Sequence, residues 1–424
     1  MANPLRIVPS GWTLCLLAFA AAGTSASEWP QWRGSARDGH APALGGLVEG
    51  SKTRSLWTIE VGEGQASPVL ADGRVVLLDR LEDEERVSAY DLESGEQLWS
   101  FAEPVRFKAG MGGGRYGGGP KSTPAIADGH VVTYGVKSVL AVRNLETGEQ
   151  LWRKDLHEDH NDPTLYWGNS MSPIVVEGRV VVQYGNAKRG GVLAFDLKSG
   201  ERLWSIEGYG SSYSSPVLYR GAADVDHVVL MTYEGPVGVS LDGKVLWTID
   251  APMTFSRQNT ATPVLAGDLL IFGSGGKPLR AHRLSFSDGR WSTEQVWSKE
   301  ELSIDMASPV AFDGKVCAVV TQKKGQLVCL ETATGAELYR SAARFDDYAV
   351  LLVTGDNLLV VRPEGELLAL RRDATAFDVE TELSISSSEI WAHPAVLADG
   401  LVVKSFDRLE RLALESDGTA GDLR

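Results

Sequence analysis

A glycine-rich stretch at residues 110–122 is the first part of the chain whose composition suggests ligand chemistry. Gly112, Gly114 and Gly117 match the GxGxxG pattern that cradles phosphates. Such a loop needs a helix N-terminus to receive the phosphate, and a β-strand pattern follows here instead. We therefore interpret the stretch as a long loop without a nucleotide site. Its candidate ligand contacts are Arg115, Tyr116 and Lys121.

The stretch His157-Glu158-Asp159-His160-Asn161-Asp162 has residue types that bind metal ions. Read as a calcium loop from Asp155, it lacks the glycine required at the sixth position, and its twelfth residue is Tyr166 rather than Glu. A surface metal site and a solvated polar connection both fit the pattern. We favour the connection and predict no metal site.

No catalytic constellation is recognisable elsewhere in the sequence. It contains neither a nucleophile elbow with a Ser-His-Asp order nor an HExxH zinc motif. Most histidines are isolated, and we expect them at surface or hydrogen-bonded positions. His393 is the exception, because it replaces Ser or Thr at a repeated position beside Trp391.

The elements that would position these residues are indicated by a repeat. Residues 89–99 alternate apolar side chains, turn at Gly95 and end in Trp99, which is typical of a β-hairpin arm. Each unit opens with a Ser-Pro or Thr-Pro pair, or with His-Pro in the last case. The openings are Ser67, Thr123, Ser172, Ser215, Thr262, Ser308 and His393.

The number of units follows from the spacing of these openings, which is 43 to 56 residues except for a last gap of 85. The long gap predicts a degenerate unit that opens at residues 348–350 and turns at Gly355-Asp356. The closing arms support a count of eight, although the arm at residues 377–383 has lost its aromatic residue. The closing aromatic residues are Trp57, Trp99, Trp152, Trp204, Trp247, Trp297 and the substitute Tyr339.

Eight units of four short strands predict an all-β fold, an eight-bladed β-propeller. Trp57 precedes every opening, and the last opening lacks a Trp arm after it. Residues 56–59 should therefore supply the outer strand of the C-terminal blade and close the ring. We expect each closing aromatic ring to pack against the neighbouring blade.

The chain divides into four parts. Residues 1–26 read as a signal peptide, with basic Arg6, an apolar run at 14–22 and the small residues Thr24-Ser25-Ala26. An ordered loop at 27–54 should pack on the propeller at 55–415, with a short tail at 416–424. The net charge of -15 becomes -16 without Arg6, which argues against binding DNA or anionic lipid. We expect an exported protein, periplasmic or extracellular, with no membrane span.

Two cysteines remain after the signal, Cys317 and Cys329, on either side of a predicted hairpin. Both thiols point to the same face if the odd-numbered residues of the two strands share that face, and export permits a disulfide. The register cannot be fixed to one residue from the sequence. A bridge and two free thiols therefore both remain open.

Propeller geometry predicts one generic binding region, the mouth of the central channel. Residues just before each opening should gather there, because the innermost strands start near the axis. Aromatic and hydrogen-bonding groups around a funnel suit an extended peptide or a small ligand. The candidate mouth residues are Lys121, Tyr166, Trp167, Asn169, Ser170, Tyr213, Arg257, Asn259, Asp305, Trp391 and His393.

The arm motif resembles the docking motif of quinoprotein-like propellers with pyrroloquinoline quinone (PQQ) repeats, roughly Ala-x-Asp-x-x-Thr-Gly-x-x-x-Trp. The stretch at residues 29–34, before the first repeat unit, resembles that of a secreted bacterial branch of PQQ-binding-like repeat proteins. That branch is similar to BamB-type scaffolds of outer-membrane assembly. The resemblance implies PQQ and calcium for the dehydrogenase members, which hold the quinone beneath a disulfide between adjacent cysteines. No two cysteines are adjacent here.

Three functions are compatible with these observations. We favour an exported, non-catalytic scaffold that binds a protein or peptide. The alternatives are a PQQ- and calcium-dependent dehydrogenase and a carbohydrate-binding module. Nucleic acid is not expected as a partner, because the chain is acidic.

Overall fold

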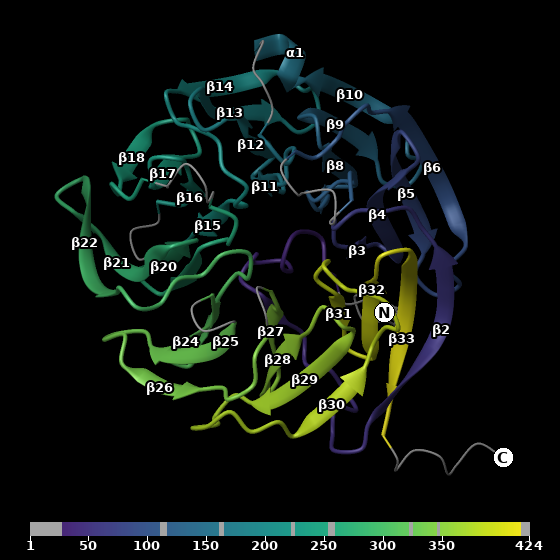
Figure 1. Ribbon diagram of the computed structural model, residues 1–424. Helices are drawn as coiled ribbons and strands as arrows, with labels where there is room; N and C mark the ends of the chain where they lie inside the picture. The colour runs from purple at the N-terminus through teal and green to yellow at the C-terminus, as the bar shows by residue number, and fades with distance from the viewer. Residues whose placement is uncertain are drawn as a thin grey trace, which may run out of the picture.

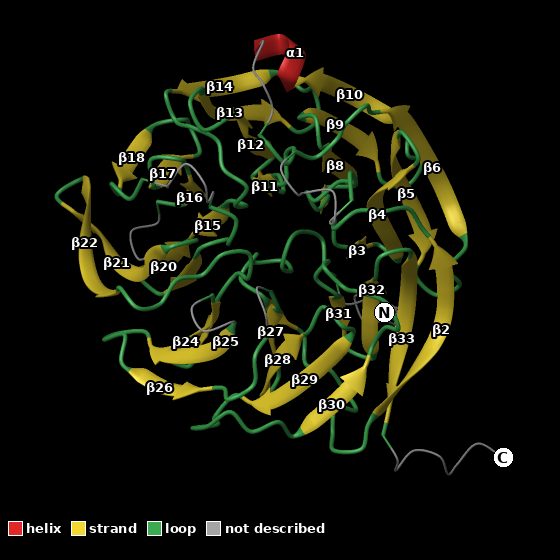
Figure 2. Ribbon diagram, in the orientation of Figure 1, coloured by secondary structure: helices red, strands yellow, loops and turns green. Residues whose placement is uncertain are grey.

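The computed structural model describes residues 28–110, 117–160, 165–221, 225–252, 259–321, 325–345 and 348–416. These residues form eight sheets arranged as a ring around a central axis (Figures 1 and 2). The predicted all-β, eight-bladed propeller is therefore confirmed. In each blade the successive strands run antiparallel, and the first strand of each blade lies nearest the axis.

The sixteen strands of the first four blades come one after another along the chain. One short helix, α1 (Leu156–His160), lies between the second and third blades. Blades 1 and 2 are β3 (Val69–Ala71), β4 (Arg74–Leu81), β5 (Glu84–Asp91), β6 (Gln97–Pro104), β7 (Ala125–Ala127), β8 (His130–Tyr134), β9 (Val139–Asn144) and β10 (Gln150–Asp155). Blades 3 and 4 are β11 (Ile174–Val176), β12 (Arg179–Gly185), β13 (Gly190–Asp196), β14 (Arg202–Glu207), β15 (Val217–Tyr219), β16 (His227–Met231), β17 (Pro236–Ser240) and β18 (Val245–Thr248).

The last four blades complete the ring. Blades 5 and 6 are β19 (Val264–Ala266), β20 (Leu269–Ser274), β21 (Lys277–Ser287), β22 (Arg290–Lys299), β23 (Val310–Phe312), β24 (Lys315–Val320), β25 (Gln326–Glu331) and β26 (Glu337–Arg340). Blades 7 and 8 are β27 (Val350–Thr354), β28 (Asn357–Val361), β29 (Glu366–Arg371), β30 (Thr381–Ser384), β31 (Ala395–Leu397), β32 (Gly400–Lys404), β33 (Arg408–Glu415) and, outermost, β2 (Lys52–Glu60). A further short strand, β1 (His40–Ala41), pairs in parallel with β27.

The ring closes with a strand from the other end of the chain, as the sequence predicts. β2 lies antiparallel to β33, and Trp57 pairs with Arg411 across the two strands (Figure 1). The degenerate unit in the 85-residue gap is also present, because β27 and β28 flank the turn at Gly355-Asp356. Radial closure of this kind leaves the sheets without long exposed edges.

Adjacent blades are joined by the closing tryptophans. In five seams the indole Nε1 donates to a backbone carbonyl of the next blade at 2.8 to 3.0 Å, and the ring covers the turn glycine of that blade or packs beside it. The donor and acceptor pairs are Trp57 and Leu92, Trp99 and Leu145, Trp152 and Leu197, Trp204 and Leu241, and Trp297 and Thr332. The repeated Trp is therefore an inter-blade contact.

Three seams depart from this pattern, and in one of them, after blade 7, the outer strand β30 carries no aromatic residue. Trp247 Nε1 donates at 3.0 Å to His227 Nε2 of its own blade. Blade 5 has a long β21–β22 hairpin, and a Cβ at its turn residue Gly289 would meet nothing within 4 Å, so this turn does not pack on the Trp247 ring. Burial lowers the pKa of His227, which fits the neutral ring that this bond requires. Tyr339 is buried in blade 6, with its hydroxyl 4.0 Å from Cys317 Sγ.

The two cysteines form a disulfide within blade 6. Cys317 on β24 and Cys329 on β25 are directly opposite each other in the antiparallel register, and both are fully buried. This register settles the alternative that the sequence leaves open.

Candidate functional site

The inner ends of the blades are linked by the repeated Ser and Thr residues. Five of the six hydroxyls accept a hydrogen bond from the backbone N–H at the opening of the preceding blade, whereas Thr262 Oγ1 accepts from Trp32 Nε1. The bonds run from Ser67 N to Thr123 Oγ1, Thr123 N to Ser172 Oγ, Ser172 N to Ser215 Oγ, Thr262 N to Ser308 Oγ and His393 N to Ser67 Oγ, all at 2.9 to 3.0 Å. The openings therefore form a hydrogen-bonded collar around the channel.

The channel inside this collar is occupied by the N-terminal segment at residues 28–41, which we call the plug. Figure 1 shows it as the purple loop at the centre of the ring. Trp29 pairs antiparallel with Leu70 of β3, and β1 runs parallel to β27. The inner strand of each blade runs away from the mouth. Trp29 is antiparallel to such a strand, so the chain runs toward the mouth there, whereas β1 is parallel to one, so the chain runs away again. The plug therefore enters from the far side, turns back within the channel and leaves on that same far side.

The plug contacts the inner strand or opening of every blade. Its polar contacts, by blade, are Trp29 to Leu70, Pro30 O to Ile126 N, Arg37 to Ser172 O and Pro173 O, Arg37 to Pro216 O, Trp32 to Thr262 Oγ1, Arg33 to Pro309 O, and Gly39 O to Val353 N. The eighth blade is reached by a ring contact, with the centroids of Trp32 and His393 4.2 Å apart. The plug therefore contacts all eight blades from within the channel, which the repeat pattern does not predict.

Two buried arginines anchor the plug, and neither forms an ion pair with a carboxylate among the residues that the structure describes. Arg37 donates to three backbone carbonyls at 2.7 to 3.1 Å and to Gln31 Oε1 at 3.1 Å. Arg33 donates to Pro309 O at 2.6 Å and Asp38 O at 3.2 Å. Burial lowers the pKa of both groups, and backbone carbonyls offset part of that cost by accepting charge-assisted hydrogen bonds. Sequence analysis did not select these residues.

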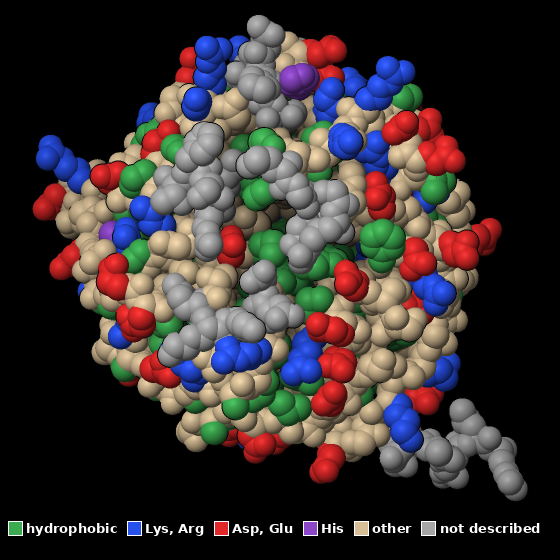
Figure 3. Space-filling view, in the orientation of Figure 1, with side chains coloured by type: hydrophobic (Ala, Val, Ile, Leu, Met, Phe, Trp, Pro, Cys, Tyr) green, Lys and Arg blue, Asp and Glu red, His purple; other side chains and the backbone are tan. Residues whose placement is uncertain are grey.

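The mouth above the plug is framed by two aromatic stacks. Trp167 lies on Tyr213 with ring centroids 5.5 Å apart, and Trp391 lies on Tyr348 at 5.1 Å. Tyr166 extends the first stack and is 47% exposed. Figure 3 shows hydrophobic side chains gathered in the hollow at the centre of the molecule. Tyr348 is a mouth residue that the candidate set does not include.

Several predicted mouth residues are occupied with structural contacts. Asn169 Nδ2 donates to Tyr134 O at 3.3 Å, and Asn259 Nδ2 donates to Thr232 O at 3.0 Å. Both are almost fully buried. Asp305 is half-buried, and its backbone carbonyl accepts from Ala261 N at 3.1 Å. These three residues hold the loops between blades in place.

His393 is buried between the plug and the collar. Burial and the positive charge of Arg33 hold its pKa well below the usual value, so the ring is neutral at neutral pH. Its Nδ1 has no hydrogen-bond partner among the described residues. We assign His393 a packing contact with Trp32 rather than an acid or base role.

A charged cluster lies beside blade 1 at the mouth. Burial raises the pKa of Glu85 to about 7, although its carboxylate accepts a 2.8 Å hydrogen bond from Val136 N. Burial lowers the pKa of Lys121 to about 8, opposed by Glu63 and Glu85. Lys121 Nζ lies 3.4 Å from Gly119 O. The cluster joins loops, because the Glu85 carboxylate accepts from Val136 N and Lys121 Nζ lies beside Gly119 O.

Replacing Glu85 with glutamine tests this electrostatic assignment. The folded-state pKa lies above the unfolded one, so the stability that this carboxyl contributes is present below about pH 4.5 and lost as pH rises through 7. Relative to the native protein, Glu85→Gln should therefore become more stable by about 2 kcal/mol from pH 5 to pH 8. Urea unfolding at both values measures the change. The exposed neighbour Glu84→Gln should show none, and an equal response from both variants would contradict the assignment.

Three candidates, Arg115, Tyr116 and Arg257, lie outside the described residues, as do Asn161 and Asp162 of the acidic stretch. His157 and Glu158 belong to α1. Across the described ranges, no group of three or more His, Cys, Asp or Glu side chains is arranged to hold a metal ion.

The residues of the channel do not fit PQQ as the dehydrogenases are expected to hold it. Cys317 and Cys329 are twelve residues apart and bonded to each other inside blade 6, where both are buried. The plug fills the axis at the level of the collar. A quinone stacked on a disulfide of adjacent cysteines therefore has no counterpart in this arrangement.

Curated relatives show what the chain is similar to. The protein named outer membrane protein assembly factor BamB from Bordetella pertussis (strain Tohama I) is 24% identical over 391 residues, covering 90% of this chain and 81% of that protein. For three further relatives with the same name, the alignment spans 60 to 62% of their length.

Solved structures share the fold. BamB from Moraxella catarrhalis superposes with a TM-score of 0.61 at 14% identity, covering 88% of this chain and 99% of that one. Quinohemoprotein alcohol dehydrogenase from Comamonas testosteroni gives a TM-score of 0.68 at 13% identity, covering 94% and 82%. At these identities the likeness concerns the fold alone, so it does not choose between a scaffold and an enzyme.

The family assignment rests on a family model described as outer membrane protein assembly factor BamB. It matches residues 47–115, 83–294 and 289–381, which run from β2 to the start of β30 and leave the plug outside. The eight blades and the repeated docking turns agree with that match. The chain therefore belongs to the BamB family of propellers.

Proposed function

We propose that this protein is an exported, non-catalytic propeller that faces the periplasm and binds a protein partner during assembly of outer membrane proteins. The observation that carries the proposal is the mouth, where two aromatic stacks surround an axis already filled by the plug. A filled axis leaves a broad shallow surface, which suits a polypeptide better than a small substrate.

The composition of the mouth supports the same proposal. Large aromatic side chains supply contact area at low entropic cost and are enriched where proteins bind one another. The buried amides of Asn169 and Asn259 beside them donate to backbone carbonyls, so they help to fix the shape of the surface. The names of the relatives place those proteins in outer membrane assembly, which gives the class of process.

A paired substitution tests the mouth. Trp167→Ala with Trp391→Ala removes one ring from each stack, and we expect recovery of the bound partner from a periplasmic extract to fall at least tenfold. The measurement is quantitative mass spectrometry after affinity capture. The control is Phe101→Ala, since Phe101 is a 39% exposed aromatic residue on the outer strand β6.

Two results would contradict the proposal. One is that the native protein captures no protein above an empty resin, and the other is an unchanged partner set with the double variant. Thermal melts of both variants show whether the fold is retained. The dehydrogenase alternative is checked separately by adding PQQ and calcium, because a stoichiometric quinone spectrum with dye reduction would replace the scaffold by an enzyme.

A further inference from the structure

A cavity of about 160 Å³ lies between blades 4 and 5, away from the aromatic stacks. Its lining comes from the ends of β16 and β20, the start of β21 and the loops after β18 and before β19, so it opens on the mouth side of the propeller. An apolar cavity of about 150 Å³ holds one benzene molecule. This one therefore has room for a single compact group.

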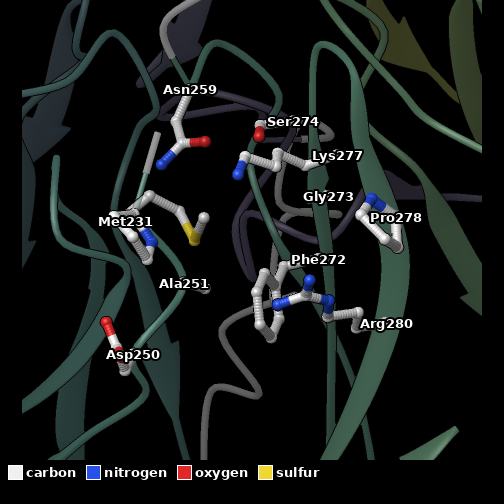
Figure 4. A pocket seen from close by; sticks show the side chains of 11 residues that line it. Met231, Asp250, Ala251, Asn259, Phe272, Gly273, Ser274, Lys277, Pro278 and Arg280 are labelled. Carbon is white, nitrogen blue, oxygen red and sulfur yellow. The ribbon is translucent and has the colours of Figure 1, made fainter. Parts of the chain in front are cut away.

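Three hydrogen-bond donors in the cavity have no partner among the described residues. Lys277 and Arg280 form neither an ion pair nor a hydrogen bond there, and Arg280 Nε is buried and unsatisfied. The Ser274 hydroxyl is also unpaired, and the residue is only 6% exposed. Figure 4 shows the Lys277 amine and the Ser274 hydroxyl turned toward the same end of the cavity.

The remaining lining divides into an apolar wall and one acid. Met231, Phe272 and Ala251 present carbon atoms to the cavity. Asp250 is exposed, and Figure 4 shows its carboxylate turned away from Arg280. Within the described residues, the cavity thus combines two cations that form no ion pair with a small apolar surface.

The residue types of these donors favour a particular ligand, since Lys277 and Arg280 are half-buried and Ser274 is buried. Lys277 and Arg280 line one cavity in which the Asp250 carboxylate is turned away from Arg280, so an anion bound there is attracted by both cations. A guanidinium and an ammonium beside a hydroxyl match the two oxygens of a carboxylate. The apolar wall then accepts the group that the carboxylate is attached to.

We propose that this cavity binds a carboxylate carried on a compact apolar group, with Arg280 and Lys277 holding the oxygens and Met231 and Phe272 contacting the carbon atoms. Such a group occurs at the C-terminus of a peptide that ends in an aliphatic residue, and also as a free aliphatic acid. The peptide source rests on the proposed function, whereas the free acid does not.

The test uses the full chain and three probes. The first is a hexapeptide labelled with fluorescein at its N-terminus, Gly-Ser-Gly-Ser-Ala-Leu, with a free C-terminal carboxylate. The second is the same peptide with a C-terminal amide, which keeps every atom except the charged oxygen. The third is 4-methylpentanoate, which reproduces the leucine side chain and carboxylate alone. Fluorescence anisotropy measures the peptides, and calorimetry measures the acid.

We expect the free carboxylate peptide to bind at least tenfold more tightly than the amide. Arg280→Met should weaken that binding at least tenfold and Lys277→Met severalfold. Arg283→Met is the matched control, because Arg283 lies on the same strand but pairs with Asp268 at 3.0 Å outside the cavity. It should change the affinity less than twofold.

The outcomes separate the two sources. Binding of 4-methylpentanoate without the peptide upholds the cavity as a site for a free acid, and binding of both that is lost in Arg280→Met upholds the peptide source. Equal affinity for the carboxylate and the amide, no binding of any probe, or an equal loss in Arg283→Met would overturn the proposal. The capture experiment on the mouth can succeed or fail independently of each result.

Discussion

Replacing Arg37 with methionine is expected to lower the free energy of unfolding by about 3 kcal/mol or more. The guanidinium donates to carbonyls of blades 3 and 4 from inside the channel, at 2.7 to 3.1 Å. Methionine keeps the length of the side chain but leaves these buried carbonyls without donors. The midpoint of urea unfolding measures the loss.

The control for this prediction is Arg179→Met. Arg179 lies on β12 of blade 3, where its guanidinium contacts only Glu177, at the surface. Removing such an exposed pair changes stability by less than about 1 kcal/mol. If both variants unfolded at the same urea concentration as the native protein, the plug would not hold the blades together as we infer.

Replacing Gly200 with alanine is expected to cost about 3 kcal/mol, and replacing Gly178 with alanine only about 1 kcal/mol. Both glycines have a positive φ, 69° and 70°, so alanine strains the backbone equally at the two sites. They differ in space, because a Cβ at Gly200 would lie 2.7 Å from Trp152 Cδ2, whereas one at Gly178 meets nothing within 4 Å.

The comparison isolates the contact between blades 2 and 3. A Cβ on Gly200 must displace the Trp152 ring and with it the 2.8 Å hydrogen bond to Leu197 O. Calorimetric or urea unfolding of the two variants gives the difference directly. Equal losses would mean that the turn glycine serves only the backbone, and that the Trp does not depend on its close approach.

The fold could be predicted because the blades repeat. Each unit of about fifty residues carries its own alternation of apolar and polar side chains, its turn glycine and its tryptophan. Strand positions therefore follow from local patterns. The 85-residue gap between openings indicates the degenerate seventh blade. The last unit lacks a Trp arm, which indicates that the strand with Trp57 closes the ring.

The candidate site could be predicted only in part. Trp167, Tyr213 and Trp391 reach the mouth because the residues before each opening must lie there. Asn169 and Asn259 occupy equivalent positions, but their amides turn inward to backbone carbonyls. Position along the repeat fixes which end of the channel a residue occupies, whereas the partners of its side chain depend on neighbouring loops.

The disulfide and the cavity illustrate the same limit. Cys317 and Cys329 could be placed on one hairpin, but a shift of one residue would have moved one of them to the other face. Lys277 and Arg280 drew no attention in the sequence, since isolated basic residues are common. Their meaning comes from a cavity between two blades in which the one acid among the described lining residues, Asp250, is turned away from Arg280.

The sequence by itself determined the eight blades, their order and the strand that closes the ring, because those features repeat or are missing at countable positions. Tertiary structure alone decided what fills the channel. Residues 28–41 have no period and lie outside the family match, so nothing local directs them inward. They enter the axis because only there can Arg33 and Arg37 meet the carbonyls of several blades at once, which requires the ring to exist.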